Sequence, residues 1–186
     1  SAAFGSLIIA RSNSGIEELS DARDKTVAAI DKMALGGFQL AWREFDNAQI
    51  NLFTDTKSLV FVGFPMDGVI DRVATGQADI GIIRSGLMER VLAEGTYAKD
   101  DFTFLNTNVT FAHPDMLSTR LYPEWPFAAL ANVAPALRDA VTIALLNAKD
   151  SPLAHDARLR NYWSSPVAYH AAIGLKQAFA FRVESP

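Results

Sequence analysis

Short apolar runs alternate with amphipathic segments between residues 24 and 105, and this alternation limits what the chain can fold into. Three of the runs have the length and composition of buried strands: Thr26–Ile30, Leu59–Val62 and Ala78–Ile83. Segments with apolar residues at helical spacing follow these runs and begin near Gly36, Pro65 and Arg84. Such alternation predicts right-handed βαβ units and a mostly parallel sheet, so we expect one compact α/β lobe here.

Strand signals become rare outside this lobe. Phe4–Arg11 and Met116–Leu121 are predicted strands, whereas three later segments are predicted helices: Pro135–Ala148, Asp150–Arg160 and Val167–Phe179. A half with so few strands is a poor stand-alone domain. We therefore predict an α/β fold with one complete parallel-sheet lobe and a partial second lobe that is rich in helices.

Composition and missing motifs exclude several classes of function. The 17 basic and 21 acidic residues are mixed along the chain and give a net charge of −4, which argues against a nucleic-acid-binding surface. The chain has no cysteine, its three histidines are scattered, and it has no HExxH, GxSxG, Walker A or GxGxxG motif. We therefore predict a non-catalytic chain with no metal and no cofactor. No apolar run approaches the roughly 20 residues of a membrane span.

Two glycines, Gly36 and Gly37, stand between a predicted strand and a predicted helix, and Phe38 and Gln39 follow them. The first backbone N–H groups of a helix lack intrahelical partners and, together with the helix dipole, favour an anion. Glycines also let the backbone approach a ligand closely. This arrangement predicts an anion site. The alternative is a turn in which both glycines serve only backbone geometry or packing.

The next connection repeats this arrangement, because Phe64, Pro65, Met66 and Asp67 lead from a predicted strand into a predicted helix. Proline suits the first turn of a helix, where its missing N–H would have no partner. Two helix N-termini at the carboxyl ends of neighbouring strands converge on one crevice, which is where open α/β sheets bind ligands. For Asp67 we favour stabilisation of the helix over contact with a ligand.

Two further segments supply polar groups. Arg84 and Ser85 lie where a strand leads into a helix, so Arg84 is a candidate for holding an oxoanion with two hydrogen bonds and Ser85 for donating to it or capping the helix. A surface arginine and a simple cap are the alternative. Ser118 and Thr119 supply hydroxyls just before an aromatic segment, in which we favour a core position for Trp125 and Phe127.

Taken together, these motifs resemble a known family. The sequences GGFQLAWRE, at residues 36–44, and LYPEWPF, at residues 121–127, are the most specific pieces, and the resemblance runs through nearly the whole chain. The chain resembles the phosphonate-binding-like periplasmic domains. Within them it is most similar to those that form the sensor region of membrane histidine kinases, such as tetrathionate sensor kinases.

The resemblance implies a type 2 periplasmic-binding-protein fold, in which two α/β lobes joined by crossover strands enclose a ligand cleft. It implies that residues 1–23 carry a crossover strand from the first lobe, that 24–105 form the second α/β lobe, and that 106–186 return to the hinge and the helical part of the first lobe. It further implies an anion held on helix N-termini and nearby hydroxyls. By position, this points to Gly36, Gly37, Phe38, Gln39, Phe64, Pro65, Met66, Asp67, Arg84 and Ser85, with Ser118 and Thr119 near the hinge.

The chain departs from the family pattern in two ways. Family domains usually begin with a further stretch of very roughly 80 to 100 residues that builds most of the first lobe, and we expect that stretch to be missing here. Apolar surface left exposed by an incomplete lobe favours self-association, so a homodimer is one expected partner. Relatives of the phosphonate type often carry a polar residue, commonly histidine, where this chain has Met66. Methionine there argues against a phosphonate ligand.

These expectations lead to one main hypothesis. The chain is predicted to be the periplasmic sensor domain of a two-component histidine kinase, binding a small anion such as an oxoanion or phosphonate-like solute, with the membrane contacted only through segments outside this chain. The alternatives are the soluble binding component of an ABC importer, the effector domain of a cytoplasmic transcription regulator, and an enzyme on the same fold. The sequence does not name the ligand.

Overall fold

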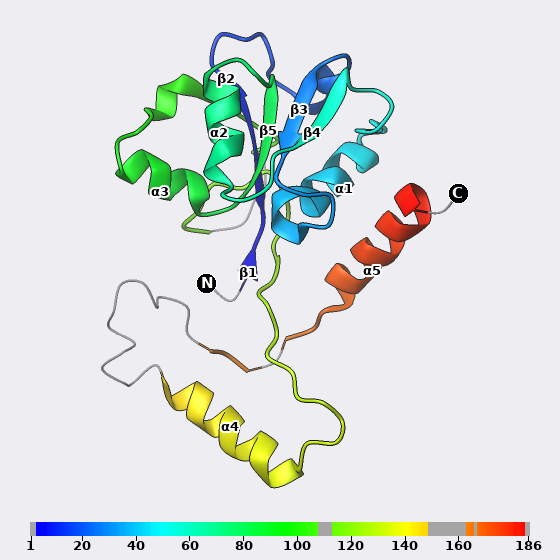
Figure 1. Ribbon diagram of the computed structural model, residues 1–186, viewed down its shortest axis with the longest axis vertical. Helices are drawn as coiled ribbons and strands as arrows, with labels where there is room; N and C mark the ends of the chain where they lie inside the picture. The colour runs from blue at the N-terminus through cyan, green and yellow to red at the C-terminus, as the bar shows by residue number, and fades with distance from the viewer. Residues whose placement is uncertain (1–2, 108–112, 149–162, 166, 185–186) are drawn as a thin grey trace. The chain divides into compact units, whose positions relative to one another are not determined.

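The computed structural model describes residues 3–107, 113–148, 163–165 and 167–184 (Figure 1). The chain divides into two compact units. The sheet unit comprises Gly5–Leu121 and Ile173–Pro186, and the helical unit comprises Ser1–Phe4 and Tyr122–Ala172. Among the described residues, no helix combines the length and the apolar character that crossing a bilayer requires. The boundaries predicted at residues 23 and 105 refer to the lobes of a whole two-lobed domain and stay a prediction.

The sheet unit is built on a five-stranded sheet in the order β4-β3-β5-β2-β6. Its strands are β2 (Ser6–Arg11), β3 (Thr26–Ala29), β4 (Ser58–Phe61), β5 (Ile80–Arg84) and β6 (Phe102–Leu105). β3 is parallel to β4 and β5, as the predicted βαβ units require, whereas β2 is antiparallel to β5 and β6. The mostly parallel arrangement predicted for residues 24–105 is confirmed, because β3, β4, β5 and β6 all run in one direction. The whole sheet is mixed, because β2, which precedes the βαβ units, runs in the opposite direction between β5 and β6.

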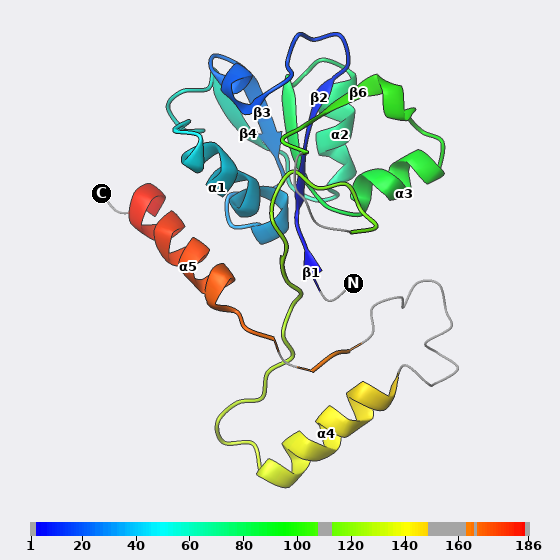
Figure 2. The same ribbon diagram turned by 180° about the vertical axis from the view of Figure 1, so that it is seen from behind.

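Helices cover both faces of this sheet. After β3, the π-helical turn η2 (Leu35–Gln39) leads directly into α1 (Leu40–Asn47). The other helices of this unit are α2 (Asp67–Ala74), α3 (Leu87–Ala93) and the short 3₁₀ turns η1 (Leu19–Ala22) and η3 (Lys99–Asp101). Figures 1 and 2 show α1 on one face of the sheet and α2 and α3 on the other.

Strand β2 is buried on both faces, because successive side chains of a strand point to opposite sides. Ile8 and Ala10 lie in one core cluster with the apolar residues of α1. Leu7 and Ile9 lie in a second cluster with those of α2 and α3. All four side chains are fully buried. Burial of each large aliphatic side chain stabilises the fold by roughly 1.5–3 kcal/mol, so β2 holds the two helical layers to one sheet.

Most of the predicted strands and helices are confirmed with small shifts of their ends. α2 begins at Asp67, two residues after Pro65, so the proline precedes the first helical turn instead of lying in it. β6 was not predicted as a strand, and Met116–Leu121 is not one. The helix predicted at Asp150–Arg160 lies outside the described residues.

In the helical unit, the N-terminal segment pairs with the beginning of the second segment. β1 (Ala3–Phe4) is antiparallel to β7 (Tyr122–Pro123), and Tyr169 donates a hydrogen bond from its hydroxyl to the Glu124 carbonyl at 2.8 Å. α4 (Pro135–Asn147) begins with its proline in the first turn, as predicted. α5 (His170–Phe179) begins in this unit and ends in the sheet unit, where η7 (Ala180–Glu184) follows.

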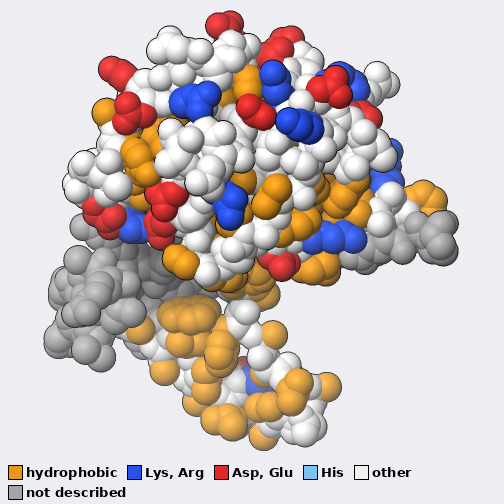
Figure 3. Space-filling view, turned by 45° about the horizontal axis from the view of Figure 1, so that its top comes forward, with side chains coloured by type: hydrophobic (Ala, Val, Ile, Leu, Met, Phe, Trp, Pro, Cys, Tyr) orange, Lys and Arg blue, Asp and Glu red, His pale blue; other side chains and the backbone are white. Residues whose placement is uncertain are grey.

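Several large apolar side chains of the helical unit are exposed, although Phe4 and Tyr122 are buried. Trp125 and Phe127, for which a core position was favoured, are each 65% exposed. Trp125 stacks on Phe4 with ring centroids 6.4 Å apart, and Phe127 meets Trp163 edge to face at 5.7 Å. Figure 3 shows apolar side chains gathered on α4, whereas basic and acidic side chains are interspersed over the sheet unit. The described part of this unit therefore holds aromatic pairs and no closed core.

The segment around Ser118 attaches to β2 through side-chain hydroxyls. β6 pairs with Ile8 and the residues after it, which leaves the first residues of β2 open on that side. There the Ile8 N–H donates to Ser118 Oγ at 2.8 Å, and the Ser6 N–H donates to Thr119 Oγ1 at 3.0 Å. Ser118 Oγ in turn donates to the Leu105 carbonyl at 2.5 Å. Hydroxyl contacts thus take the place of the strand predicted at 116–121.

We predict that Ser118→Ala lowers the free energy of unfolding by about 1–3 kcal/mol, because it leaves the buried Ile8 N–H and Leu105 carbonyl without this partner. Urea denaturation followed by circular dichroism would measure the change. Ser20→Ala, which removes an exposed hydroxyl, is the control and should stay within about 0.5 kcal/mol of the wild type. Equal stability of the two variants would contradict the structural role of Ser118.

Glu44 connects α1 to the same connecting segment. Burial raises the pKa of the Glu44 carboxyl above its ordinary value of 4.5, and the nearby charge and backbone N–H of Arg120 and the charge of Arg43 only partly oppose that rise. The folded state therefore holds the proton of Glu44 more tightly than the unfolded chain does. The resulting contribution to stability is complete below pH 4.5 and is lost as the pH rises through the raised pKa.

Glu44→Gln should abolish this pH dependence, because the amide is about the same size and carries no charge. We expect the stability of the wild type relative to Glu44→Gln to fall between pH 4.5 and pH 7. Urea midpoints of both proteins across this range would measure the difference. Glu17→Gln, at an exposed position, serves as the control. A wild type that gains stability over Glu44→Gln as the pH rises would show that the Arg120 interaction outweighs burial.

Candidate ligand-binding site

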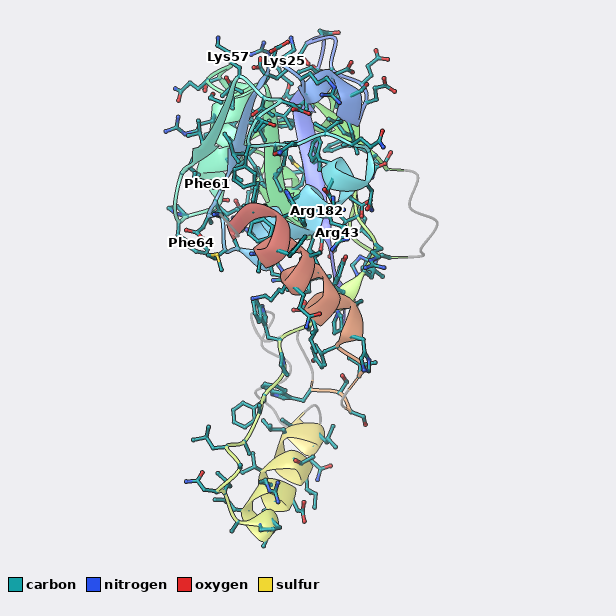
Figure 4. All side chains as sticks on the ribbon, turned by 90° about the vertical axis from the view of Figure 1, so that its right-hand side faces the viewer. Lys25, Arg43, Lys57, Phe61, Phe64 and Arg182 are labelled. Atoms are coloured by element: carbon teal, nitrogen blue, oxygen red, sulfur yellow. The ribbon has the colours of Figure 1, made fainter. Side chains whose placement is uncertain are left out.

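The carboxyl ends of β3, β4 and β5 lie at one edge of the sheet, because these strands are parallel. Three of the four segments with predicted site residues begin there: residues 35–39, 63–67 and 84–85. We call this edge the carboxyl-end crevice. Figure 4 shows Phe64 at this end of β4, and Lys25 and Lys57 at the opposite end of the sheet. The structure therefore brings these three segments to the edge at which open α/β sheets bind ligands.

The first segment presents a helix N-terminus to the crevice. The N–H of Gln39 donates to the Ala34 carbonyl at 3.0 Å, and the N–H of Leu40 donates to the Leu35 carbonyl. The four N–H groups before Gln39 have no intrahelical acceptor, as at the start of any helix. The helix dipole adds positive potential at this point. The Gly36 carbonyl accepts a 2.6 Å hydrogen bond from the Ser6 hydroxyl, which holds this turn against β2.

Gly37 is required by close packing. A Cβ atom at this position would lie 2.4 Å from Ile30 Cγ2 and 3.1 Å from Met66 Cε, distances that leave no room for a side chain. Gly37 lies in a helical turn and has no positive φ. The glycine is therefore needed because neighbouring side chains approach its backbone closely, and not because of its backbone conformation. Gly37 therefore allows close packing, and the same packing brings the start of the helix to the sheet edge.

Gln39 is a buried polar residue in this first turn. Its side chain is 1% exposed, and Nε2 donates to the Lys32 carbonyl at 3.3 Å. The other amide atom, Oε1, has no hydrogen-bond partner among the described residues. A buried acceptor without a donor is costly, so a water or a ligand group is the expected partner. Phe38, the residue before it, is fully buried among Phe53, Phe61 and Phe179 and acts in the core.

The second segment contributes one residue to the crevice and one to the surface. Met66 lies at the start of α2, and its sulfur accepts a hydrogen bond from the Arg84 N–H at 3.3 Å. Phe64 is 82% exposed. Asp67 forms an ion pair with Arg90, which also binds Glu94. These two carboxylates raise the pKa of Arg90, and Glu94 has the larger effect. Asp67 thus has a partner within the protein, in line with the favoured structural role.

The third segment is tied to the beginning of β2. The Gly5 N–H donates to Ser85 Oγ at 3.1 Å, and the Ser85 N–H donates to the Gly5 carbonyl at 3.0 Å. Ser85 does not cap α3, because Gly86 is the N-cap residue and no side chain caps that helix. Ser118 and Thr119, from the fourth segment, bond the backbone of β2 in the same manner and are fully buried. These three hydroxyls therefore position β2 beside the crevice.

A separate pocket lies at the other end of α1. It has a volume of about 440 Å³ and is lined by Trp42, Asp46, Gln49, Ile50, Asn51, Asp55, Arg182 and Val183. None of the predicted site residues lines it. Asp46 pairs with Arg182, and Asp55 pairs with Arg23, so its carboxylates have partners. No local sequence pattern indicated this pocket, because Arg182 and Val183 of the C-terminal segment form part of its lining.

The described residues contain no group of three or more metal-ligating side chains. The crevice offers backbone N–H donors, a buried amide and a thioether, and none of these is a nucleophile or a proton-transfer group at ordinary pH. Such a set can bind and orient a solute.

Known proteins share both the sequence and the fold. The family described as "ABC transporter, phosphonate, periplasmic substrate-binding protein" matches residues 1–168. The tetrathionate sensor histidine kinase TtrS of Salmonella typhimurium is 36% identical over 165 residues, which is 89% of this chain and 26% of that protein. This chain therefore corresponds to about a quarter of the length of that kinase.

Two solved structures agree with the fold over nearly the whole chain. PhnD1 of Prochlorococcus marinus, in complex with methylphosphonate, has a TM-score of 0.68 at 13% identity and covers 97% of this chain and 67% of its own. XAC2383 of Xanthomonas citri, bound to ATP, has a TM-score of 0.67 at 20% identity and covers 98% and 68%. At these identities the likeness shows the fold alone. With its type 2 periplasmic-binding-protein fold, the chain belongs to the family of periplasmic substrate-binding proteins of phosphonate ABC transporters.

Proposed function

We propose that this chain is the extracytoplasmic ligand-binding domain of a two-component sensor histidine kinase and binds a small anion at the carboxyl-end crevice. One observation carries the proposal: a helix N-terminus whose first four N–H groups lack intrahelical acceptors lies at the sheet edge beside two other loop segments. The 36% identity to a sensor kinase supports the role in signalling. The family, whose description names periplasmic proteins, supports a location in the periplasm.

In this proposal the residues of the crevice have distinct roles. The backbone N–H groups of residues 35–38 bind the anion, and the Gln39 amide fixes one further group of the solute. Arg84 supplies positive charge at the end of β5. Ser85, Ser118 and Thr119 act indirectly, because their hydroxyls hold the β2 backbone. Phe64 is exposed at the rim, where an aromatic ring can cover a bound solute.

A sensor must also convert binding into a change of state. A ligand shifts a conformational equilibrium only by its difference in affinity for the two states. The proposed anion therefore acts by favouring one arrangement of the residues around the crevice. No enzymatic step in this chain is needed, and any phosphoryl transfer belongs to the kinase part of the whole protein.

Anion binding can be tested in the full-length protein. We expect at least one of tetrathionate, thiosulfate or methylphosphonate to raise the melting temperature, because a ligand at about 100 times its Kd adds roughly 2.7 kcal/mol of stability. Differential scanning fluorimetry would measure the shift, with sodium chloride at equal ionic strength as the control. If none of these anions and neither sulfate nor phosphate binds, the anion-binding role is wrong.

A substitution at the N-cap residue tests whether the anion binds at the helix N-terminus. Ala34 is the N-cap residue, and no side chain caps the helix there. Ala34→Asp should stabilise the protein by about 1 kcal/mol, since aspartate is a favourable N-cap. The same carboxylate should weaken anion binding by on the order of tenfold or more, because it competes for the N–H groups and repels the ligand. Isothermal titration calorimetry would measure the affinity and urea denaturation the stability.

Ala34→Asn is the matched control for this experiment. Asparagine caps a helix about as well as aspartate but carries no charge. We expect Ala34→Asn to keep more of the anion affinity than Ala34→Asp does. Opposite signs of the two effects in Ala34→Asp separate loss of binding from loss of folding. Unchanged affinity in Ala34→Asp would place the ligand elsewhere.

The family supports a second candidate function. The same crevice would serve the soluble binding component of an ABC importer, as the description of the family states for its members. The two candidates differ in what the whole protein does with the ligand. A binding anion that changes autophosphorylation of the purified full-length protein in vesicles supports the sensor. Absence of any phosphorylation, with anion-dependent stimulation of a transporter ATPase, supports the importer.

A further inference from the structure

Strand β4 forms one edge of the sheet, and its outer side is open. Among the described residues, only β3 pairs with β4. The Lys57 N–H donates to the Lys25 carbonyl on the β3 side at 2.9 Å. Because successive N–H groups of a strand alternate in direction, those of Ser58 and Val60 point to the open side. The strand SLVF contains no charge and no proline, two of the devices that prevent an edge from pairing with another chain.

Large apolar side chains are exposed beside this edge. Phe53 and Phe61 both meet Phe38 edge to face, with ring centroids 5.9 and 5.1 Å apart, so they lie together on the face of the sheet that α1 covers. They are 38% and 39% exposed. Met33 and Phe64, in the loops after β3 and β4, are 57% and 82% exposed. At the opposite edge, β6 exposes no large apolar side chain. We call Met33, Phe53, Phe61 and Phe64 the β4 patch.

The β4 patch has the apolar area that a homodimer needs. Large side chains of this kind bury about 150–250 Å² each, so the exposed fractions amount to roughly 400 Å² in one copy and roughly 800 Å² in two. A protein–protein interface of standard size buries about 1,600 Å², of which about 57% is apolar. Two copies of the patch would therefore supply most of the apolar part of such an interface.

Charge and symmetry favour an antiparallel pair of β4 strands. Figure 4 shows Lys25 and Lys57 near one end of the strand and Phe61 and Phe64 near the other. A parallel pair would bring the lysines of both copies together, whereas an antiparallel pair separates them and places Lys57 near the aromatic end of the second copy. A two-fold axis perpendicular to the sheet relates two such copies, so both use the same surface and both patches lie on one face of a continuous sheet.

We propose that the β4 edge is a homodimer interface, in which the β4 strands of two copies pair antiparallel and the two β4 patches meet across the seam. The partner is a second copy of this chain, because each copy offers the same uncharged edge flanked by phenylalanines. The interface differs from the apolar surface of an incomplete lobe, from which the sequence predicted self-association. The inference does not depend on the anion-binding role proposed above.

Cysteine cross-linking in the full-length protein tests this interface, because residues 1–186 contain no cysteine. Val60→Cys lies near the middle of β4, where a two-fold axis brings the two copies of one residue close together. We expect a short bismaleimide to convert most of this variant into covalent dimer, measured by denaturing gel electrophoresis. Thr103→Cys, within β6 at the opposite edge, is the matched control and should stay at the level of the wild type.

Two further substitutions test the strand pairing itself. Ser58→Pro removes an outward N–H at the first residue of β4, where proline is tolerated, and Phe61→Lys places a charge in the β4 patch. Each of them, combined with Val60→Cys, should lower the cross-linked fraction by about fivefold or more. Melting curves followed by circular dichroism identify the folded variants, and Ser58→Pro covers the case in which Phe61→Lys does not fold. Phe64 stays unchanged, because it also lies at the rim of the proposed anion site.

Three results would overturn the interface: no cross-linking of Val60→Cys above the wild type, equal cross-linking of Thr103→Cys, or an unchanged cross-linked fraction in the folded variants. Arg138→Cys, at an exposed position of α4, reports on the other apolar surface. Cross-linking of Arg138→Cys without cross-linking of Val60→Cys would place the association on the helical unit and overturn the proposal as well.

Discussion

Strand β2 is the element on which the rest of the sheet unit depends. It pairs with β5 along five residues and with β6 along four, and its side chains enter both core clusters. Hydroxyls from two other segments hold its beginning: Ser118 and Thr119 accept from the backbone of β2, and Ser85 accepts from Gly5 just before it. Ser6 in turn bonds the Gly36 carbonyl. A single buried strand thus connects the sheet, the connecting segment and the start of the helix that forms the candidate site.

The candidate site arises from tight packing and not from a flexible glycine loop. Gly37 has no side chain because Ile30 and Met66 occupy the space around it. That contact brings the uncapped start of the helix to the carboxyl end of the sheet. Interiors packed at this density tolerate little change in volume. A substitution at Gly37 would therefore disturb folding and binding together, which is why Ala34 is the better position at which to test the site.

The sequence predicted the parallel part of the fold well, because β3, β4 and β5 are short apolar runs and α1 carries apolar residues at helical spacing. The direction of β2 could not be predicted in the same way. Its run Leu7–Ala10 is apolar on both faces, so the sequence would fit a parallel or an antiparallel strand equally well. β6 was missed because FTFL is a short run that directly follows three charged residues. Met116–Leu121 looked like a strand, but its hydroxyls and not its backbone supply most of the contacts with β2.

For the candidate site residues, the positions could be predicted from the sequence but the individual roles could not. Their positions at strand ends were predictable, because parallel strands place their carboxyl ends together. Their individual roles were not, because each depends on a partner that is distant in the sequence. Ser118 binds Ile8, 110 residues earlier, and Met66 binds Arg84, 18 residues later. No local pattern distinguishes a hydroxyl that holds a strand from one that binds a solute.

Helix α1 connects the candidate site to the last described part of the chain. Its first turn carries the N–H groups of the candidate site, and roughly 15 Å further along its axis Asp46 pairs with Arg182 of η7. Between these points Trp42 meets Phe179 of α5 edge to face at 4.8 Å. A helix packed in this way moves as a unit, since its side chains interlock with the core. A shift of its first turn would therefore be transmitted to its contacts with α5 and η7.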